Sequence, residues 1–301
     1  MEWALAISHG HNIHYLSDPW QKTAVLDMNQ LRKVIEAVAG KINFTRLYFG
    51  QEFCEKALPR PKELLLAIDK AIEYGMEFTL VTPYVTEQGL IELKLLFKEL
   101  VEILPNCEVV VNDWGILHLL NGEFPTLSPI LGRLLNKAWR DPRINSYLPI
   151  HNQEDFLKPF QSSNLTSPLI KDLLESLKVE RVELDNLPQG LDGRIFEMGY
   201  LTSLYLPYGC ITSGRVCLLG SWGLEVKEKF KASQSNCGQK CRFCWLEMKD
   251  TGNKVPDSSE WRILQKGNTV FYLQLDSFLN NSLEQVNSLG IDRIVLQPEP
   301  L

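Results

Sequence analysis

The chain has 301 residues, of which 45% are apolar and 23% are charged. Because a chain of this size and composition buries a large core, we exclude an intrinsically disordered protein. The net charge of −6 gives no general attraction for the phosphates of nucleic acid, so we expect a small or neutral substrate and no nucleic-acid partner. Residues 1–16 lack a secretory signal, and no apolar stretch approaches the roughly 18 residues of a membrane span. We therefore expect a cytoplasmic protein with no membrane span.

The first half of the chain alternates short β-branched runs with helical patterns of apolar residues. These patterns predict strands at 4–8, 44–49, 77–82 and 108–111, and helices at 29–38, 62–74 and 88–103. Gly40 and Gly75 stand where the C-caps of the first two helices belong. Repeated strand–helix units of this kind require a parallel sheet, because parallel neighbours need a crossover connection.

The second half continues the series less regularly. It predicts a helix at 169–177 with a strand at 181–184, a further unit at 194–198 counted as a strand, and a helix at 282–289 with a strand at 292–296. Residues 135–137 have the pattern of a helix and residues 141–163 are irregular, so the fifth strand has no clear place. The total approaches the eight strands of a (β/α) barrel.

Right-handed crossovers permit either an open doubly wound sheet or a closed barrel. We favour an α/β fold of the TIM-like (β/α) barrel type, irregular or incomplete near the fifth strand. Residues 210–256 break the pattern and are predicted to form a cysteine-rich loop insertion on the barrel. No shift of composition marks a second domain, so residues 1–301 are expected to form a single barrel domain.

The clustering of cysteines is the strongest local signal, since five of the seven lie between Cys210 and Cys244. The missing signal segment argues against disulfides and favours metal or cluster ligation. Cys237, Cys241 and Cys244 fall within eight residues, and three thiolates at this spacing converge readily on a soft metal centre. Cys107, next to a predicted strand, is expected to pack in the core.

Two other interpretations of these motifs stay open. The Cys-x-x-x-Cys-x-x-Cys spacing is that of radical-SAM enzymes, but those place the triplet near the first strand, whereas 57 residues follow Cys244 here. His9, His11 and His14 follow the first strand, where metal-dependent barrel hydrolases carry a zinc-binding His-x-His pair. Asp113, at a strand end, is either a catalytic base, a substrate contact or, as the simplest interpretation, a helix N-cap.

Three short segments resemble the collagenase-like peptidase family, U-32. Residues 47–54 (LYFGQEFC) are similar to a strand end of its UbiV-type members, which act in oxygen-independent ubiquinone hydroxylation. Residues 109–115 (VVVNDWG) resemble the family's strand that ends in an Asn-Asp-x-Gly-like turn. Residues 212–217, followed by Cys237 and Cys241, resemble a Ser-Gly-Arg-Cys-like turn with a later Cys-x-x-x-Cys.

The resemblance implies a [4Fe-4S] cluster bound by one early and three late cysteines. The matching positions are Cys54, Cys217, Cys237 and Cys241. The sequence departs from the family by an extra Val216 before Cys217 and by a longer spacer to Cys237. Cys210, whose spacing to Cys217 resembles the UbiU type, and Cys244 therefore remain alternatives for the fourth ligand. Lys240 and Arg242, beside these positions, are of the kind that favours thiolates.

For function, the resemblance implies a subunit of an oxygen-independent hydroxylase that takes its oxygen from prephenate. The implied substrate is a ubiquinone precursor or another small aromatic, quinone-like molecule, and the implied partner is a heteromeric one of the UbiU type. Whether the chain is catalytic alone or is a non-catalytic electron-transfer partner stays open. The family also has RNA-hydroxylating members, which the acidic charge disfavours here. No Gly-x-Ser-x-Gly or Ser/His/Asp arrangement supports a peptidase.

Overall fold

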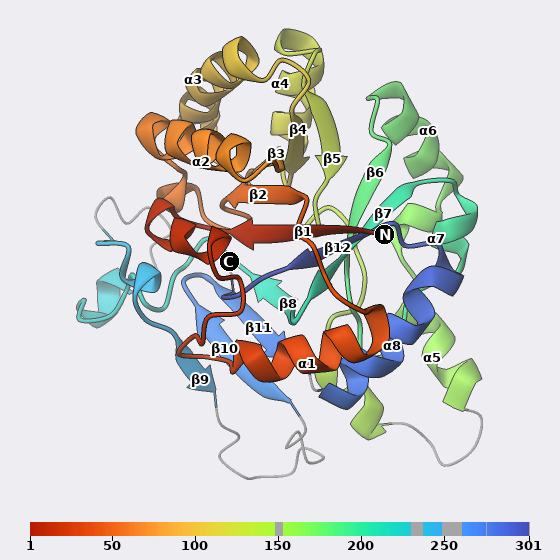
Figure 1. Ribbon diagram of the computed structural model, residues 1–301. Coiled ribbons are helices and arrows are strands. Elements are labelled where there is room, and N and C mark those ends of the chain that lie inside the picture. Colours follow the sequence, from red (N-terminus) through yellow and green to blue (C-terminus); the bar gives the residue numbers. More distant parts are fainter. Residues whose placement is uncertain (148–152, 230–236, 249–260, 275, 301) are drawn as a thin grey trace.

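The computed structural model describes residues 1–147, 153–229, 237–248, 261–274 and 276–300 (Figure 1). Within these residues, eight parallel strands close into a barrel in the order β1-β12-β7-β6-β5-β4-β3-β2. Their bounds are Glu2–Ile7 (β1), Arg46–Gly50 (β2), Glu77–Val81 (β3), Glu108–Val111 (β4), Ser128–Leu131 (β5), Arg181–Asp185 (β6), Leu201–Leu206 (β7) and Arg293–Leu296 (β12). The closed barrel confirms the TIM-like α/β fold and excludes the open doubly wound sheet.

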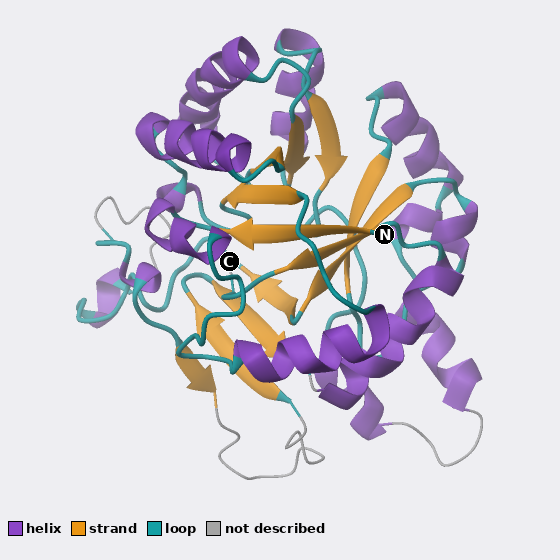
Figure 2. Ribbon diagram, in the orientation of Figure 1, coloured by secondary structure: helices purple, strands orange, loops and turns teal. Residues whose placement is uncertain are grey.

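Helices cover the outer side of the barrel (Figure 2). Their bounds are Met28–Ala39 (α1), Pro61–Glu73 (α2), Glu87–Ile103 (α3), Trp114–Glu123 (α4), Gln153–Gln161 (α5), Pro168–Ser176 (α6), Arg194–Glu197 (α7) and Asp276–Leu289 (α8). Asp27 caps the first helix by accepting from the backbone N–H groups of Asn29 and Gln30 at 3.0 and 3.2 Å. Gly40 and Gly75 follow the first two helices with φ of 74° and 65°, as the sequence predicts for C-caps.

The fifth strand lies at Ser128–Leu131, where the sequence pattern indicated none. Pro129 obscures it, because a proline lacks the N–H that a central strand donates and so argues against a strand. Residues 135–137 form a turn and a bend, not the expected helix, and the stretch expected to be irregular contains α5. Both expectations were therefore wrong. The strand β5 itself has only four residues, too few to show a period.

The seventh strand was also misplaced. Residues 194–198 contain the short helix α7, and β7 begins only at Leu201. Thr202 to Leu206 are all buried, so this strand faces apolar surroundings on both sides and shows no alternation of polar and apolar residues. Without alternation, the sequence does not show where the strand begins and ends.

The chain passes from β7 directly into a second, antiparallel sheet, called the small sheet below. Its strands, in the order β8-β11-β10-β9, are Tyr208–Ser213 (β8), Thr269–Leu273 (β11), Arg262–Lys266 (β10) and Leu246–Met248 (β9). The prediction that residues 210–256 form a loop was therefore wrong for β8 and β9, while residues 230–236 and 249–256 lie outside the described residues. Tyr208, Cys210 and Phe271 of the small sheet pack in one cluster with Tyr48 and Tyr205 from inside the barrel.

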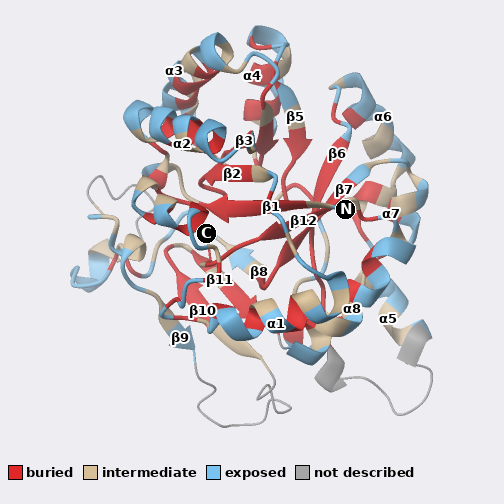
Figure 3. Cartoon of the chain, viewed as in Figure 1, coloured by how far each residue is buried: buried red, intermediate tan, exposed pale blue. Residues whose placement is uncertain are grey.

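The small sheet thus covers the interior at the carboxyl ends of the barrel strands, and buried residues run through both sheets (Figure 3). A second, larger apolar cluster fills the space between the barrel strands and the outer helices. In barrels, the carboxyl end carries the binding and catalytic groups. No helix in the described ranges has both the length and the apolar character needed to cross a membrane.

Candidate functional site

Four cysteines lie on loops near the carboxyl end of the barrel. Cys54 precedes the short turn Glu55–Ala57, four residues after the end of β2. Cys217 lies four residues after β8, and Cys237 and Cys241 belong to a later loop. All four side chains are partly buried, neither sealed in the core nor fully in solvent.

These four thiols, called the thiol quartet below, lie close enough to interact electrostatically in every pair. Burial raises the pKa of the Cys54 thiol to about 12, and the nearby sulfur atoms of Cys241, Cys217 and Cys237 contribute to the rise. Burial, with Cys217 and Cys237 adding to it, likewise raises the pKa of Cys241 to about 11, whereas the charge of Lys266 works in the opposite direction. The fold therefore gathers residues that are more than 150 positions apart in the sequence.

Polar contacts fasten the late cysteine loop to the loop of Cys54. The side-chain amide of Gln239 donates to the carbonyl of Lys56, two residues beyond Cys54. Arg242 reaches the carboxylate of Glu63 in α2 at 3.8 Å. Because these contacts join segments far apart in sequence, they hold the late loop against the chain that follows the carboxyl end of β2.

Asn268, at the turn between β10 and β11, ties three further parts of the site together. Its Nδ2 donates to the carbonyl of Phe53 at 2.7 Å, to the carbonyl of Gly214 at 2.7 Å and to the hydroxyl of Tyr84 at 2.9 Å. Phe53 and Gly214 lead into the loops that carry the first two cysteines of the thiol quartet. No sequence pattern indicates this role, because an asparagine in a hairpin turn is ordinarily a turn residue.

The other cysteines lie outside the thiol quartet. Cys210 is fully buried in β8, its backbone N–H donates to Asp185 Oδ1 at 3.0 Å, and burial raises the pKa of its thiol. Cys244 is exposed, and its charge acts on Cys217. Cys107 is buried in the outer apolar cluster, as expected for a packing residue.

Four cysteine thiols are the residue types that a [4Fe-4S] cluster takes as ligands. In the residues that the structure describes, no three His, Cys, Asp or Glu side chains are grouped as ligands of one metal ion. A [4Fe-4S] cube makes a different demand, because each thiolate binds its own iron and the four sulfur atoms stand apart around the cube. Thiolates are also the soft ligands that such clusters take.

The three histidines follow β1, with His9 just before the 3-10 turn Gly10–Leu16 and His11 and His14 on it. The rings of His9 and His11 stack at 5.3 Å with 16° between their planes, and His14 is exposed. Burial, reinforced by the charges of Arg242 and Lys266, lowers the pKa of His9 to about 3, so this ring is neutral. Like the rest of the described chain, the three form no group of ligands around one ion.

Asp113 and the basic residues of the late loop have identifiable partners. Asp113 accepts from the backbone N–H groups of Gly115 at 2.7 Å and Val85 at 3.1 Å, which is the capping role. Lys240 donates to the carbonyl of Trp222 at 3.1 Å. The lysine whose charge acts on a thiol of the quartet is instead Lys266 of β10.

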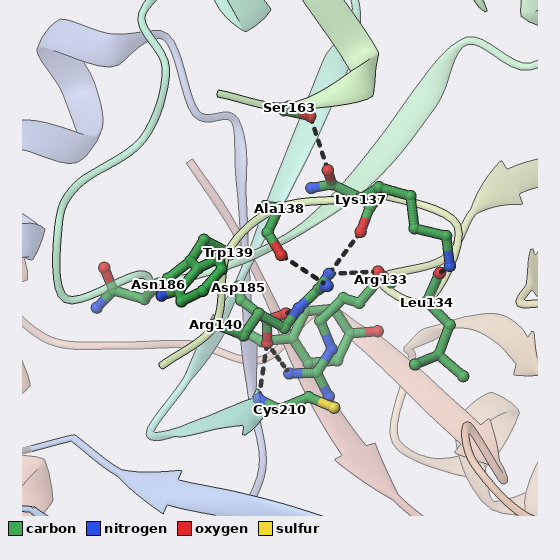
Figure 4. A network of polar contacts seen from close by, with 12 residues as sticks. Arg133, Leu134, Lys137, Ala138, Trp139, Arg140, Ser163, Asp185, Asn186 and Cys210 are labelled. Atoms are coloured by element: carbon green, nitrogen blue, oxygen red, sulfur yellow. Dashed lines mark hydrogen bonds and ion pairs between the residues drawn. The ribbon is translucent and has the colours of Figure 1, made fainter. Parts of the chain in front are cut away.

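Under the small sheet, a buried network of ion pairs closes the carboxyl end of the barrel interior (Figure 4). Arg133, with 0% of its side chain exposed, donates to both oxygens of Glu52 at 2.8 and 2.5 Å and to Asp185 at 2.8 Å. Arg140 donates to the other oxygen of Asp185 at 2.7 Å. Although burial works to raise it, the two guanidinium groups hold the pKa of Asp185 below its usual value.

This network positions the two chain segments that lead to Cys54 and to Cys217. Glu52 stands two residues before Cys54. Asp185 accepts from the backbone N–H of Cys210 in β8, and the chain continues from the end of β8 to Cys217. Arg133 also donates to the carbonyl of Tyr208 at 3.2 Å. Sequence analysis missed all of these charged residues, because only their position at or beyond the carboxyl ends of barrel strands distinguishes them from surface charges.

A second network lies at the amino end of the barrel. The hydroxyl of Tyr48 donates to Glu183 at 3.0 Å and accepts from Arg293 at 2.8 Å, and Arg293 continues to Glu108 at 2.8 Å. Burial raises the pKa of Glu183 to about 7. A cavity of about 800 Å³ opens on this face, between the loops that precede β3 to β6. This face of a barrel generally contributes to stability.

No protein-family model matches the chain, and no curated protein matches it in sequence. Among solved structures, the U32 peptidase Mk0906 aligns with a TM-score of 0.44 and 9% identity, over 100% of this chain and 94% of that one. The spore cortex-lytic enzyme SleL of Bacillus megaterium aligns with a TM-score of 0.26 and 12% identity, over 98% of this chain and 70% of that one. At these TM-scores, neither likeness decides what the chain does.

Proposed function

We propose that this chain is an iron–sulfur protein of the collagenase-like peptidase family, U-32, similar to its UbiV-type members. In this proposal, Cys54, Cys217, Cys237 and Cys241 hold a [4Fe-4S] cluster. One observation carries it: the fold holds the loop of Cys54, which follows the second strand, against the loops of the three late cysteines, since Gln239 donates to the carbonyl of Lys56 and Asn268 donates to the carbonyls of Phe53 and Gly214. The three motifs that resemble the family supply the rest of the support.

The surroundings of the thiol quartet favour ligation in specific ways. The backbone N–H of Gly220 donates to Cys217 Sγ at 3.1 Å, a contact that stabilises a thiolate. Lys266 lowers the cost of a negative charge at Cys241. When bound, the cluster supplies one-electron transfer or a Lewis-acidic iron, and the residues described here hold and orient it.

The proposed activity is that of a subunit in an oxygen-independent hydroxylase. The substrate is a ubiquinone precursor or another small aromatic molecule, the oxygen comes from prephenate, and the second subunit is of the UbiU type. The setting is the cytoplasm. These elements rest on the family resemblance of the motifs.

The first test is the metal content of protein purified without oxygen. The proposal expects brown protein with about four irons and four sulfides per chain and broad visible absorption, as a thiolate-bound cube gives. Colourless, iron-free protein after anaerobic reconstitution contradicts it.

The second test separates ligands from spectators by substitution. Cys54→Ser, Cys217→Ala, Cys237→Ala and Cys241→Ala should each lose iron, because each removes one of four thiolates. Cys210→Ser and Cys244→Ser are the matched controls and should keep iron, since the first lies outside the quartet and the second at its exposed edge. If Cys244→Ser loses iron and Cys54→Ser keeps it, the radical-SAM triplet is correct and the UbiV-type assignment fails.

A further inference from the structure

The cavity at the amino end of the barrel, called the amino-end cavity below, has no part in the site of the thiol quartet. Its volume of about 800 Å³ lies within the roughly 300–1,000 Å³ of pockets that hold small organic ligands. Its lining comes from the loops before β3, β4, β5 and β6 and from the carboxyl-terminal turns of α2 and α4. It is therefore large enough for a ligand and lies at the opposite end of the barrel from the cysteines.

The amino-end cavity lies where β5 and β6 separate toward their amino ends (Figure 1). All four residues of β5 pair with β4, but only Ile130 and Leu131 pair with β6, through Arg181 and Val182. Pro129 has no backbone N–H, so β5 cannot donate a hydrogen bond at this position to either neighbour. Through this gap the cavity reaches Ile130, whose side chain packs in the barrel interior. The opening is thus a consequence of how β5 is built.

One wall of the amino-end cavity is apolar. Its large side chains that remain partly or fully open to solvent are Ile72, Met76, Leu104, Leu177 and Leu201. Ile72 is 62% exposed and Leu201 is 47% exposed. Covering such side chains is favourable, because it removes apolar surface from water. The wall therefore offers binding energy to an apolar body.

Uncharged polar side chains complete the lining. They are Asn106, Asn121, Thr126 and Ser128. Among the described residues, these side chains have no hydrogen-bond partner. Amides and hydroxyls both donate and accept, so they suit a ligand that carries an amide or a hydroxyl group of its own.

The arginines of the lining already have carboxylate partners. Arg46 contacts Glu2 at 2.7 Å and Glu108 at 3.2 Å. Arg181 donates to both oxygens of Asp292 at 2.9 and 2.7 Å. A phosphate or a carboxylate would have to displace one of these ion pairs and place its own charge near Glu108. The cavity therefore disfavours anions.

The remaining charged residues of the lining are exposed and belong to its rim. They are Glu77, Lys178 and Glu180. Two carboxylates and one ammonium group leave a surplus of one negative charge, and solvent and salt screen charges in such positions. A cation gains little from them, so the apolar wall and the uncharged polar groups determine the class of ligand.

We propose that the amino-end cavity binds a small, uncharged organic molecule with an apolar body and an amide or hydroxyl group. The apolar body covers the wall that includes Ile72 and Leu201, and the polar group pairs with the free amides and hydroxyls of the lining. This site goes beyond the proposed function, because it shares no residue with the thiol quartet and its occupation requires no iron.

The test is a fluorine NMR titration of the full chain with three probes of similar size: para-fluorobenzamide, para-fluorobenzoate and para-fluorobenzylamine. They are neutral, anionic and cationic at pH 7. We expect the neutral amide to bind with a dissociation constant of about 1 mM or lower, the affinity typical of so small a molecule. It should bind at least about threefold more tightly than either ion, because no unpaired charge of the cavity interior compensates an ionic probe.

A matched pair of variants locates the probe. Ile72→Ala on α2 should weaken binding of the amide at least about threefold, because it removes apolar contact. Ile91→Ala on α3 is the control and should leave the affinity unchanged, since Ile91 is 57% exposed and lies outside the lining. Ser128→Leu places a larger side chain in the cavity and should also weaken binding. Urea midpoints verify that each variant is folded, and Ile72 is exposed enough for its variant to fold in any case.

Three results overturn the proposal. They are the absence of binding by the neutral amide, tighter binding of either ion, and equal affinities for Ile72→Ala and Ile91→Ala. The titration is run on iron-free and on anaerobically reconstituted protein, and the affinity should be the same in both. Binding that disappears with iron places the probe at the thiol quartet and also overturns the proposal. Protein that never takes up iron but binds the amide refutes the cluster assignment alone and leaves the amino-end site in place.

Discussion

The buried arginine at the centre of the barrel mouth allows a quantitative prediction. Arg133→Met removes the only positive charge that contacts Glu52 directly in the described structure, while a methionine of similar length fills most of the volume. Asp185 keeps its ion pair with Arg140 at 2.7 Å, so the loss falls mainly on Glu52. Breaking a buried ion pair from one side costs about 3–5 kcal/mol, because the remaining charge stays buried without its partner.

The cost should depend on pH with a definite sign. Burial already raises the pKa of Glu52, and removal of the guanidinium raises it further, above its value in the unfolded chain. A carboxyl group whose pKa is raised by folding contributes stability that is present at low pH and is lost as pH rises through the folded-state pKa. Arg133→Met should therefore be more destabilising at pH 8 than at pH 5.

The assay is urea unfolding followed by tryptophan fluorescence, with Lys94→Met as the control. Lys94 makes a surface ion pair with Glu123 at 2.5 Å, and such a pair contributes under about 1 kcal/mol. Arg133→Lys keeps the charge but loses the two-pronged contact, so its unfolding free energy should fall between those of the native chain and Arg133→Met. A loss below about 1 kcal/mol for Arg133→Met, or a loss that is independent of pH, refutes the reasoning.

Two further predictions concern the ends of the barrel. Glu183→Gln keeps the hydrogen bond from Tyr48 but removes a buried carboxyl whose pKa is raised to about 7, so stability should no longer fall between pH 4.5 and 7. Glu183→Gln should raise the unfolding free energy by about 3 kcal/mol at pH 8, measured from urea midpoints. Equal pH profiles of stability for the variant and the native chain contradict the prediction. Asn268→Asp removes the donor to three acceptors at the thiol quartet, so a chelator should strip iron several-fold faster from this variant. Asn106→Asp, at the opposite end of the barrel, is the control and should not change the rate. Equal rates of iron loss for the two variants contradict the role of Asn268.

The barrel could be predicted from the first half of the chain because its units are regular. Residues 44–49 and 77–82 were predicted as strands with a helix between them, and β2 and β3 match them within two residues. The two failures have different physical causes. A strand buried on both faces, such as β7, shows no alternation, and a strand as short as β5 offers too few residues for a pattern.

The sequence also indicated which residue type would form the candidate site, since cysteines spaced for a soft metal centre are visible without a structure. Only the tertiary structure decided which of them meet. Cys210 stands closer in sequence to Cys217 than Cys54 does, yet it is buried in β8 beside Asp185, while Cys54 joins Cys217 at the barrel mouth. Barrel closure makes the difference, because it brings the ends of the second and seventh strands to one face, and no local pattern records that closure.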